Sequence, residues 1–350
     1  MFEKTAEFVS SLKKIKFVLV IPLLVLISAS VFIYQKFFGG SIQEFSDNEF
    51  IVGNSSQKKQ PEKEVNVKEQ ARKQEMVAVA YVGEPAEGVR EVVERTGNLD
   101  FIQPGQKVLV KPNVNSDDPA PGTTHPEALA EVVRLAKERG AYVVVGDRSN
   151  PRWQTIPAMK KTGMYRATED AGADEIVGFE NEDWIRVKPE KAENWPRGFR
   201  VPARLAQFDH VISVPVLHTH SITGHSLAIK NLVGLIHPDD RMVFHASSNL
   251  GKMIAEIGLA VRPSLTVIEG TKAFIAGGPS HGTLATPKVY LASKDILAAD
   301  VLGAKFLEKH GAEFERSSPW ESVQIQHAFS LGLGNFSREQ LEKENKRLTL

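Results

Sequence analysis

No cysteine occurs among the 350 residues of this chain. Its absence excludes disulfide bonds, thiolate metal sites, cysteine nucleophiles and iron–sulfur clusters held by cysteine. Net charge is missing as well, because 43 lysines and arginines balance 43 aspartates and glutamates. No nucleic acid is therefore expected as a partner, and any divalent metal cofactor would have to be held by His, Asp or Glu.

Charged residues are absent from one long stretch near the N-terminus. The 18 residues from Phe17 to Tyr34 carry no charge, and as a helix they would rise about 27 Å, enough to span a bilayer core. Lysines are concentrated before this run and acidic residues after it, which predicts a single-pass cell-membrane protein with a cytoplasmic N-terminus and an extracytoplasmic main domain. A cleaved signal peptide is the alternative, since Ser28-Ala29-Ser30 is a small-x-small triplet.

Changes in composition divide the chain into five segments. The stretch after the uncharged run is polar and nearly free of aromatic residues, as is typical of a tether, and short β-branched runs begin at Met76. We expect a cytoplasmic N-terminus at 1–16, a transmembrane anchor at 17–38, a flexible linker at 39–75, an α/β domain at 76–310 and a helical C-terminal extension at 311–350.

Strands and helices are expected to alternate along the domain. A T-x-x-E capping box at Thr124–Glu127 begins one helix, which ends at Gly140. The pattern predicts an α/β fold with a mostly parallel or mixed sheet and helices on both faces, preceded by one transmembrane helix. The expected strands are 76–82, 107–113, 141–147, 174–179, 184–189, 210–215, 265–270 and 288–293, and the further helices are 86–96, 154–171, 225–236, 248–261, 295–309, 319–331 and 337–348.

Polar residues stand where several of the expected strands end. Lys111 and Asn113 follow one strand, Asp147 ends another, and Glu269 closes a third. In sheets of this class, ligands bind outside the carboxyl ends of the strands. These four residues are therefore candidates for a common cleft.

Histidines are concentrated in residues 211–245, which hold five of the ten in the chain. His218 and His220 follow a strand, and in an extended chain they would share one face. Three interpretations stay open: a ligand pair for a divalent metal, hydrogen-bonding or acid/base residues in a metal-free cleft, or structural histidines. His225 is expected near the start of the next helix, and His245 is a further candidate for the same cleft.

Further candidates lie in that helix and in a later loop. Lys230 and Asn231 stand amid apolar residues, and they either point at an anion or satisfy neighbouring structural groups. The glycine-rich loop 274–287 contains Gly278 and His281 but no P-loop or dinucleotide-binding signature. It is either a loop that lets backbone approach a ligand or a plain connection.

Three other short patterns concern aspartates. Asp239 and Asp240 with Arg241 are expected to form a turn with a local salt bridge. Asp295 is expected to cap a helix. Asp300 lies inside that helix, where a carboxylate is unusual, and it is therefore a better candidate for a functional role than Asp295.

Several motifs follow one another from about residue 76 to 310: VLVKPNVN, TTHPEAL, YVVVGD, TGM, VISVPVLHTHSITGHSLAIKNLVGLI, R-x-x-x-H at 241–245, LTVIEG, GGPSHG and LASKDILAADVLGAKFL. Together they resemble the domain of unknown function 362 family. The resemblance implies an α/β domain but no particular activity. It also implies a set of polar positions that this chain shares with the family. They are Lys111, Asn113, Thr124, Asp147, His220, Lys230, Asn231, His245, Glu269 and Asp300.

The chain departs from this family at one point. Where the family commonly shows P-K-L-K-T-H, this chain has P-V-L-H-T-H, so that Val216 and His218 replace two cations. The departure weakens the implied anion binding at that spot.

The sequence predicts a membrane-anchored extracytoplasmic enzyme that acts on a small anionic substrate, such as a carboxylate or phosphate. Lys111 and Lys230 would hold the anion. The alternative is a tethered protein that binds a small ligand or metal without catalysis. The further substrate-binding candidates are Asn113, Asn231, Gly278 and His281.

Five side chains are candidates for the chemistry. His220, with His218 or His245, would transfer a proton, or His218 and His220 together would hold a metal. Asp147 and Glu269 would orient a histidine or complete the ligand shell of the metal.

Overall fold

The computed structural model describes residues 43–44, 76–312 and 318–349. The chain divides into two units, Met1–Gln43 and Glu44–Leu350. The expected anchor at 17–38 lies outside the described residues, as does the expected linker at 39–75 apart from the two-residue strand β1 (Gln43–Glu44). No helix within the described part of the chain is long and apolar enough to cross a membrane.

The second unit is built on a seven-stranded sheet. Its strands are β2 (Ala78–Tyr81), β3 (Lys107–Pro112), β4 (Tyr142–Asp147), β5 (Glu175–Gly178), β8 (His210–Val214), β11 (Leu265–Gly270) and β14 (Val289–Ser293). They are arranged in the order β2, β14, β11, β8, β3, β4, β5. Neighbours from β11 to β5 run parallel, whereas β14 is antiparallel to both of its neighbours. The expected mostly parallel sheet is confirmed.

The central strands are apolar on both faces, as a covered parallel sheet requires. In β4, Val143, Val144 and Val145 are all fully buried. Val144 packs in one core cluster, and its two neighbours pack in the other. Because side chains alternate along a strand, a continuous valine run supplies both cores at once.

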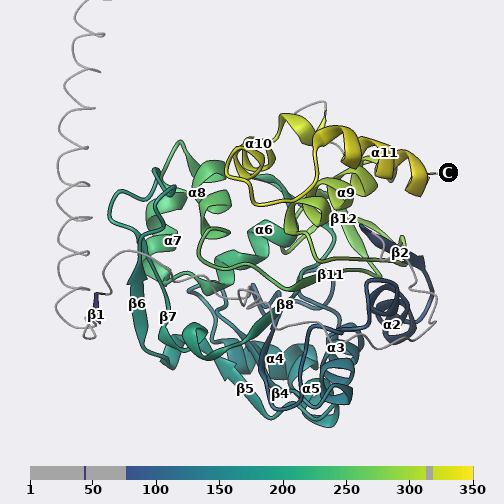
Figure 1. Cartoon of the computed structure of the whole chain (residues 1–350), viewed down its shortest axis with the longest axis horizontal. Coiled ribbons are helices and arrows are strands. Elements are labelled where there is room, and N and C mark those ends of the chain that lie inside the picture. The colour runs from purple at the N-terminus through teal and green to yellow at the C-terminus, as the bar shows by residue number, and fades with distance from the viewer. Residues whose placement is uncertain (1–42, 45–75, 313–317, 350) are drawn as a thin grey trace, which may run out of the picture. The chain divides into compact units, whose positions relative to one another are not determined.

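Helices cover both faces of the sheet, as the sequence predicts (Figure 1). The core on one face includes side chains of α2 (Pro85–Arg95), α3 (Pro126–Glu138), α4 (Thr155–Thr162) and α5 (Met164–Asp170). The core on the other includes those of α6 (Ala228–Asn231), α7 (Pro238–His245), α8 (Leu250–Ile257) and α9 (Ile296–Lys309). The C-terminal helices α10 (Val323–Ser330) and α11 (Arg338–Thr349) pack on this second layer.

Three hairpins and four short 3-10 helices complete the described part. The hairpins pair β6 (Trp184–Val187) with β7 (Phe199–Pro202), β9 (His218–His220) with β10 (Gly224–Ser226), and β12 (Ala273–Gly277) with β13 (Gly282–Ala285). The Thr219 hydroxyl lies 3.0 Å from the Phe274 carbonyl and 3.2 Å from that of Gly277, which joins β9 to β12. The 3-10 helices are η1 (Phe179–Asn181), η2 (Ala203–Gln207), η3 (Leu232–Leu235) and η4 (Pro319–Glu321).

The expected capping box at Thr124 is wrong. His125 caps α3, and its Nδ1 accepts a hydrogen bond from the Glu127 backbone N–H at 3.3 Å. The Thr124 hydroxyl instead accepts from the Asn113 backbone and donates to the Val214 carbonyl, both at 2.8 Å. Its hydroxyl is therefore used to join the ends of β3 and β8.

The expected turn at 239–241 is also wrong, because these residues form the first part of α7. Asp239 and Asp240 do not pair with Arg241. They pair with Arg200, at 3.1 and 2.9 Å respectively. Tertiary contact with a residue 40 positions away has replaced the local salt bridge.

Two expected helices differ in extent and one cap is confirmed. The helix expected at 225–236 is shortened to α6 and η3, since His225 belongs to β10. The helix expected at 154–171 is divided into α4 and α5 at Gly163, whose φ is 84°. Asp295 caps α9 by accepting from the Ala298 N–H at 2.8 Å.

Candidate functional site

The ends of β3 and β4 bring a lysine and an aspartate together. Lys111 Nζ lies 2.8 Å from Asp147 Oδ1, and both side chains are buried. The other carboxylate oxygen of Asp147 accepts the Val114 backbone N–H at 2.8 Å. Burial lowers the pKa of Lys111, and the Asp147 charge opposes that effect. Asp147 therefore balances a lysine, and none of its hydrogen bonds within the described residues reaches a histidine; its expected role toward a metal stays a prediction.

Asn231 holds this lysine from the opposite side. Its Oδ1 accepts from Lys111 Nζ at 3.1 Å, and its Nδ2 donates to Ser213 Oγ at 2.9 Å. The amide thus links α6 to the ends of β3 and β8. Its hydrogen bonds are made within the protein, which favours the structural interpretation of Asn231 over the expected substrate contact.

Gly234 lies directly against the ion pair. A Cβ atom at this position would overlap Asp147 Oδ1 and come within 2.7 Å of Lys111 Nζ. The chain therefore needs glycine here because nothing larger fits beside the paired charges.

The ion pair is part of the lining of a hollow that we call the strand-end cleft. The empty space in and directly above the cleft, open solvent included, is about 420 Å³. Its lining comes from the ends of β3 and β4, from β9 and β10, and from the segment between α6 and α7. The lining residues are Lys111, Asn113, Asn115, Asp147, Arg148, His218, Ser226, Lys230, Asn231, Val233, Gly234, Arg241 and Pro279.

Basic side chains outnumber acidic ones in this lining. Lys111, Arg148, Lys230 and Arg241 face the cleft together with one carboxylate, that of Asp147. Neither arginine is among the site residues expected from the sequence. Arg148 directly follows a strand-end aspartate, and Arg241 begins the R-x-x-x-H motif at 241–245; these were the available signals.

The two arginines are held by backbone carbonyls. Arg241 donates to the carbonyls of Ile236, Ser149 and Arg148 at 2.7 to 2.9 Å. Burial lowers the pKa of Arg241 to about 10, which still leaves it cationic near neutrality. Arg148 donates through Nη1 to the Ser149 and Trp153 carbonyls, and its buried Nε has no partner among the described residues.

Lys230 stands apart from the other cations of the cleft. The side chain is partly buried, and within the described chain its Nζ makes no hydrogen bond and no ion pair. Burial, followed by the charge of Arg241, lowers the pKa of Lys230 to about 8. Lys230 lines the cleft, and its expected role in binding an anion stays a prediction.

His218 presents an unpaired nitrogen in the same lining. Its Nδ1 lies 2.6 Å from the Thr219 carbonyl oxygen, which can only accept, so Nδ1 carries the proton. Nε2 is buried and has no partner among the described residues. Burial, with the charges of Lys230 and His225, lowers the pKa of His218 to about 4. At neutral pH this nitrogen is a lone-pair acceptor.

His220 and His245 lie outside the cleft lining. His220 Nδ1 accepts from the Ile222 and Thr223 backbone N–H groups, at 3.1 and 3.4 Å. Burial, then the charge of Lys230, lowers the pKa of His220. His245 is exposed, and its Nδ1 donates to the Arg241 carbonyl at 2.7 Å. Both belong to the surroundings of Lys230.

Three other expected site residues are placed elsewhere. Glu269 is fully buried, and its carboxylate accepts backbone N–H groups of Thr271 (2.7 Å) and His125 (3.4 Å). Burial raises the pKa of Glu269. Gly278 is buried beside the cleft, next to the lining residue Pro279, while His281 is exposed.

The described residues contain no group of three His, Cys, Asp or Glu side chains placed to hold a metal ion. His218 and His220 both use Nδ1 within the protein, so Nε2 would be the ligand atom of each. A divalent metal held by this pair stays a prediction.

Asp300 belongs to the support of the cleft. Its side chain is fully buried, and Oδ1 accepts the Ile229 backbone N–H at 3.0 Å, one residue before Lys230. Oδ2 accepts from Gln324 Nε2 at 2.9 Å and lies 3.7 Å from His225 Nε2. A carboxylate inside α9 thus fixes the start of α6.

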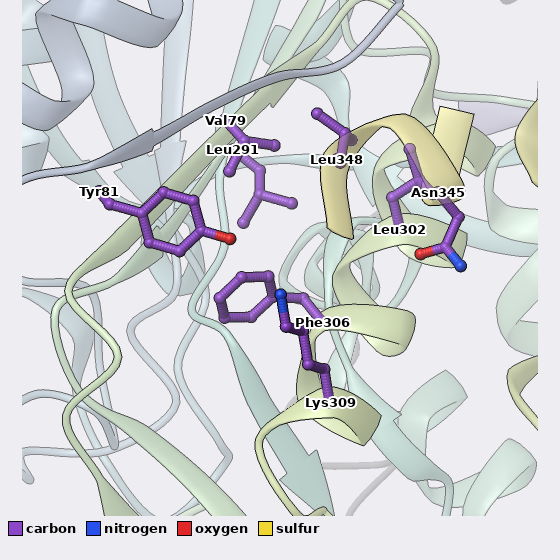
Figure 2. Close-up of a pocket in the computed structure, with 8 residues that line it drawn as sticks. All are labelled: Val79, Tyr81, Leu291, Leu302, Phe306, Lys309, Asn345 and Leu348. Carbon is purple, nitrogen blue, oxygen red and sulfur yellow. The ribbon is translucent and has the colours of Figure 1, made fainter. Parts of the chain in front are cut away.

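A second hollow of about 310 Å³ lies between the β2 and β14 edge of the sheet and helices α9 and α11 (Figure 2). Its lining is largely apolar, with Leu291, Leu302 and Leu348 around the rings of Tyr81 and Phe306. It holds no acid/base pair, and the strand-end cleft is therefore the better candidate for chemistry.

Comparison with known proteins identifies one relative and a family. The thylakoid-associated protein sll1697 of Synechocystis sp. is 26% identical over 229 residues, which cover 63% of this chain and 69% of that protein. The sequence profile of the domain of unknown function (DUF362) matches residues 108–305. This range contains the whole lining of the strand-end cleft and more than half of the chain. The chain belongs to the DUF362 family.

Proposed function

We propose that the strand-end cleft binds a small anion, such as a carboxylate or phosphate, and that the protein is an enzyme acting on it. The observation that carries this proposal is the basic lining of the cleft. Four basic side chains accompany one carboxylate, and Lys230 has no partner among the described residues. Because an unpaired charge that is partly buried is costly, an anionic ligand would supply the missing partner.

His218 is the group best placed to move a proton. Its Nε2 is unprotonated, buried and part of the same lining as Lys230. A bound anion would oppose the charge of Lys230, which now lowers the pKa of His218. Ligand binding would therefore make His218 a stronger base. This supports proton-transfer chemistry on the ligand, such as hydrolysis, isomerisation or elimination.

We also propose that residues 17–38 anchor the protein in a membrane, with the α/β domain on the extracytoplasmic side. The uncharged run and the lysines before it support this arrangement. The Synechocystis relative is named for its association with thylakoids, which is consistent with a membrane location. Added protease should therefore digest the domain in intact cells. A domain that is protected in intact cells and digested only after lysis would contradict the extracytoplasmic placement.

Anion binding is tested by titration calorimetry of the detergent-solubilised full-length chain with inorganic phosphate and with acetate. Losing one charge-assisted contact costs about 1.5–3 kcal/mol, so Lys230→Gln should weaken binding of the preferred anion by about tenfold to a hundredfold. Lys252→Gln, a change of an exposed lysine on α8, is the matched control. Equal affinities in wild type and Lys230→Gln would overturn the proposed site.

Binding without catalysis is the second candidate function. It is favoured by the low pKa of His218, about 4, which leaves a weak base in the empty cleft. A screen of phosphate esters and carboxylic acids decides between the two. In an enzyme, His218→Gln should remove turnover while anion affinity persists, whereas in a binding protein the wild type turns over no compound that it binds.

The predicted metal is tested separately by elemental analysis of the purified protein. A near-stoichiometric divalent metal that is lost in the His218→Ala/His220→Ala double variant would establish the pair as ligands. Metal absent from both proteins, with reconstitution also failing, would leave His218 as a metal-free acid/base or hydrogen-bonding group.

A further inference from the structure

The two lysines of the strand-end cleft have opposite surroundings. Lys111 Nζ is bound by Asp147, by Asn231 and by the Pro112 carbonyl, at 2.8, 3.1 and 2.8 Å. Lys230 Nζ has no such partner anywhere in the described residues, although it lines the same space. Lys111 Nζ is therefore held by three partners, whereas Lys230 Nζ has none within the described residues.

The surroundings of Lys230 make its neutral form easier to reach than that of an ordinary lysine. Burial and the Arg241 charge both disfavour the ammonium and lower the pKa of Lys230 to about 8. At pH 8 about half of the Lys230 side chains would be neutral amine. For an ordinary lysine this neutral fraction would be about a hundred times smaller. A desolvated lysine beside another cation is the usual form of an amine nucleophile toward carbonyl carbon.

The rest of the lining suits the anionic part of a carbonyl compound. Arg148 has an unpaired Nε, and Arg241 adds a second positive charge. The Ser226 hydroxyl and the Asn113 amide make no side-chain hydrogen bond within the described chain. The cleft is open to solvent on one side, so a small acid can reach these groups from outside.

We propose that Lys230 forms an imine with the carbonyl carbon of a small oxo acid whose carboxylate is held by the basic lining. The Nζ lone pair attacks the carbonyl carbon and gives a carbinolamine. The carbon–oxygen bond then breaks, a carbon–nitrogen double bond forms, and the two protons of the amine leave with the oxygen as water. No oxidant or reductant takes part. The inference rests on the proposed function, because the same cleft must first bind the anionic group.

The imine is tested by reductive trapping on the detergent-solubilised full-length chain. The protein is incubated at pH 8 with pyruvate or 2-oxoglutarate and sodium cyanoborohydride, and the modified lysines are located by peptide mass spectrometry. We expect the reduced adduct on Lys230 with a yield at least about tenfold above that on the exposed Lys252, because far more free amine is present. Peptide mapping of the wild type needs no variant, so the result does not depend on how a variant folds.

Two variants and one ligand complete the experiment. Lys230→Arg keeps the charge but cannot form an imine, so the adduct at this position should vanish, whereas Lys252→Arg should trap as well as the wild type. Lactate, which has the carboxylate but no carbonyl, is titrated in parallel by calorimetry.

The outcomes separate the two proposals. If lactate binds and neither oxo acid modifies Lys230 above the level of Lys252, the imine is overturned while the anion site stands. If neither lactate nor phosphate binds and no adduct forms, both proposals fall. An adduct confined to Lys230 that lactate suppresses by competition supports both.

Discussion

Replacing Lys230 by methionine should make the domain more stable at neutral pH. The ammonium is partly buried and has no partner in the described chain. Methionine is close to lysine in length and loses nothing when it is removed from water. A binding residue that costs stability in the free protein is expected where function, not folding, has selected it.

The magnitude follows from the pKa of Lys230, which falls from its ordinary value of 10.5 to about 8. At about 1.4 kcal/mol per pH unit, this difference corresponds to about 3 kcal/mol at pH 7. Because the side chain keeps some exposure, we expect a gain of about 2 kcal/mol. The folded wild type loses this proton at lower pH than the unfolded chain, so the contribution of Lys230 to the free energy of unfolding rises between about pH 8 and 10.5.

Urea denaturation at pH 7 and at pH 10 measures both effects. The free energy of unfolding of Lys230→Met should exceed that of the wild type by about 2 kcal/mol at pH 7. Most of that difference should disappear at pH 10, because the wild-type lysine becomes neutral. Lys252→Met, on the surface of α8, should change stability by less than about 0.5 kcal/mol at either pH. A Lys230→Met protein that is less stable than wild type at pH 7, or an advantage that does not depend on pH, would refute the reasoning.

Two further substitutions test the support of the cleft. Gly234→Ala would place a methyl group against Asp147 Oδ1. Urea denaturation should show a free energy of unfolding lowered by about 3–5 kcal/mol, as for a broken buried ion pair. Calorimetry should show that phosphate binding is lost. Asp300→Ala leaves the Ile229 N–H and the Gln324 amide without their acceptor. The free energy of unfolding should therefore fall by about 1–3 kcal/mol. Phosphate affinity should fall as well, because α6 is no longer fixed. Stability lost without any change in phosphate affinity would show that Asp300 does not position Lys230.

The sheet was predictable because its strands are buried on both faces. The three successive valines Val143–Val145 of β4 are all fully buried and apolar, so no long-range information is needed to recognise this strand. The hairpins β9–β10 and β12–β13 were not predicted, because strands of three to five residues carry too little periodicity. The start of α7 was readable from Pro238 and the two aspartates after it, but it was interpreted as a turn.

The site was predictable in part from the rule that ligands bind at strand ends. Lys111 and Asp147 end adjacent parallel strands, and they do meet. Glu269 also ends a strand, yet its carboxylate binds the His125 N–H at the start of α3, on the face opposite to α6. Alternation along β11 fixes which side a residue faces only once its register in the sheet is known. A strand-end position therefore predicts the edge of the sheet but not the face.

The arrangement of charges in the cleft argues that it is kept for a ligand. A folding argument alone would place an acidic partner beside Lys230, as Asp147 stands beside Lys111, or would place an apolar side chain there. The chain does neither. The buried carboxylate of Asp300 accepts the backbone N–H of Ile229, next to Lys230, and does not pair with the Lys230 ammonium. The carboxylate thus sets the position of the lysine without neutralising its charge. Such a charge, held in place and left unpaired, contradicts local stability rules in the way that binding sites do, and it leaves room for one anion.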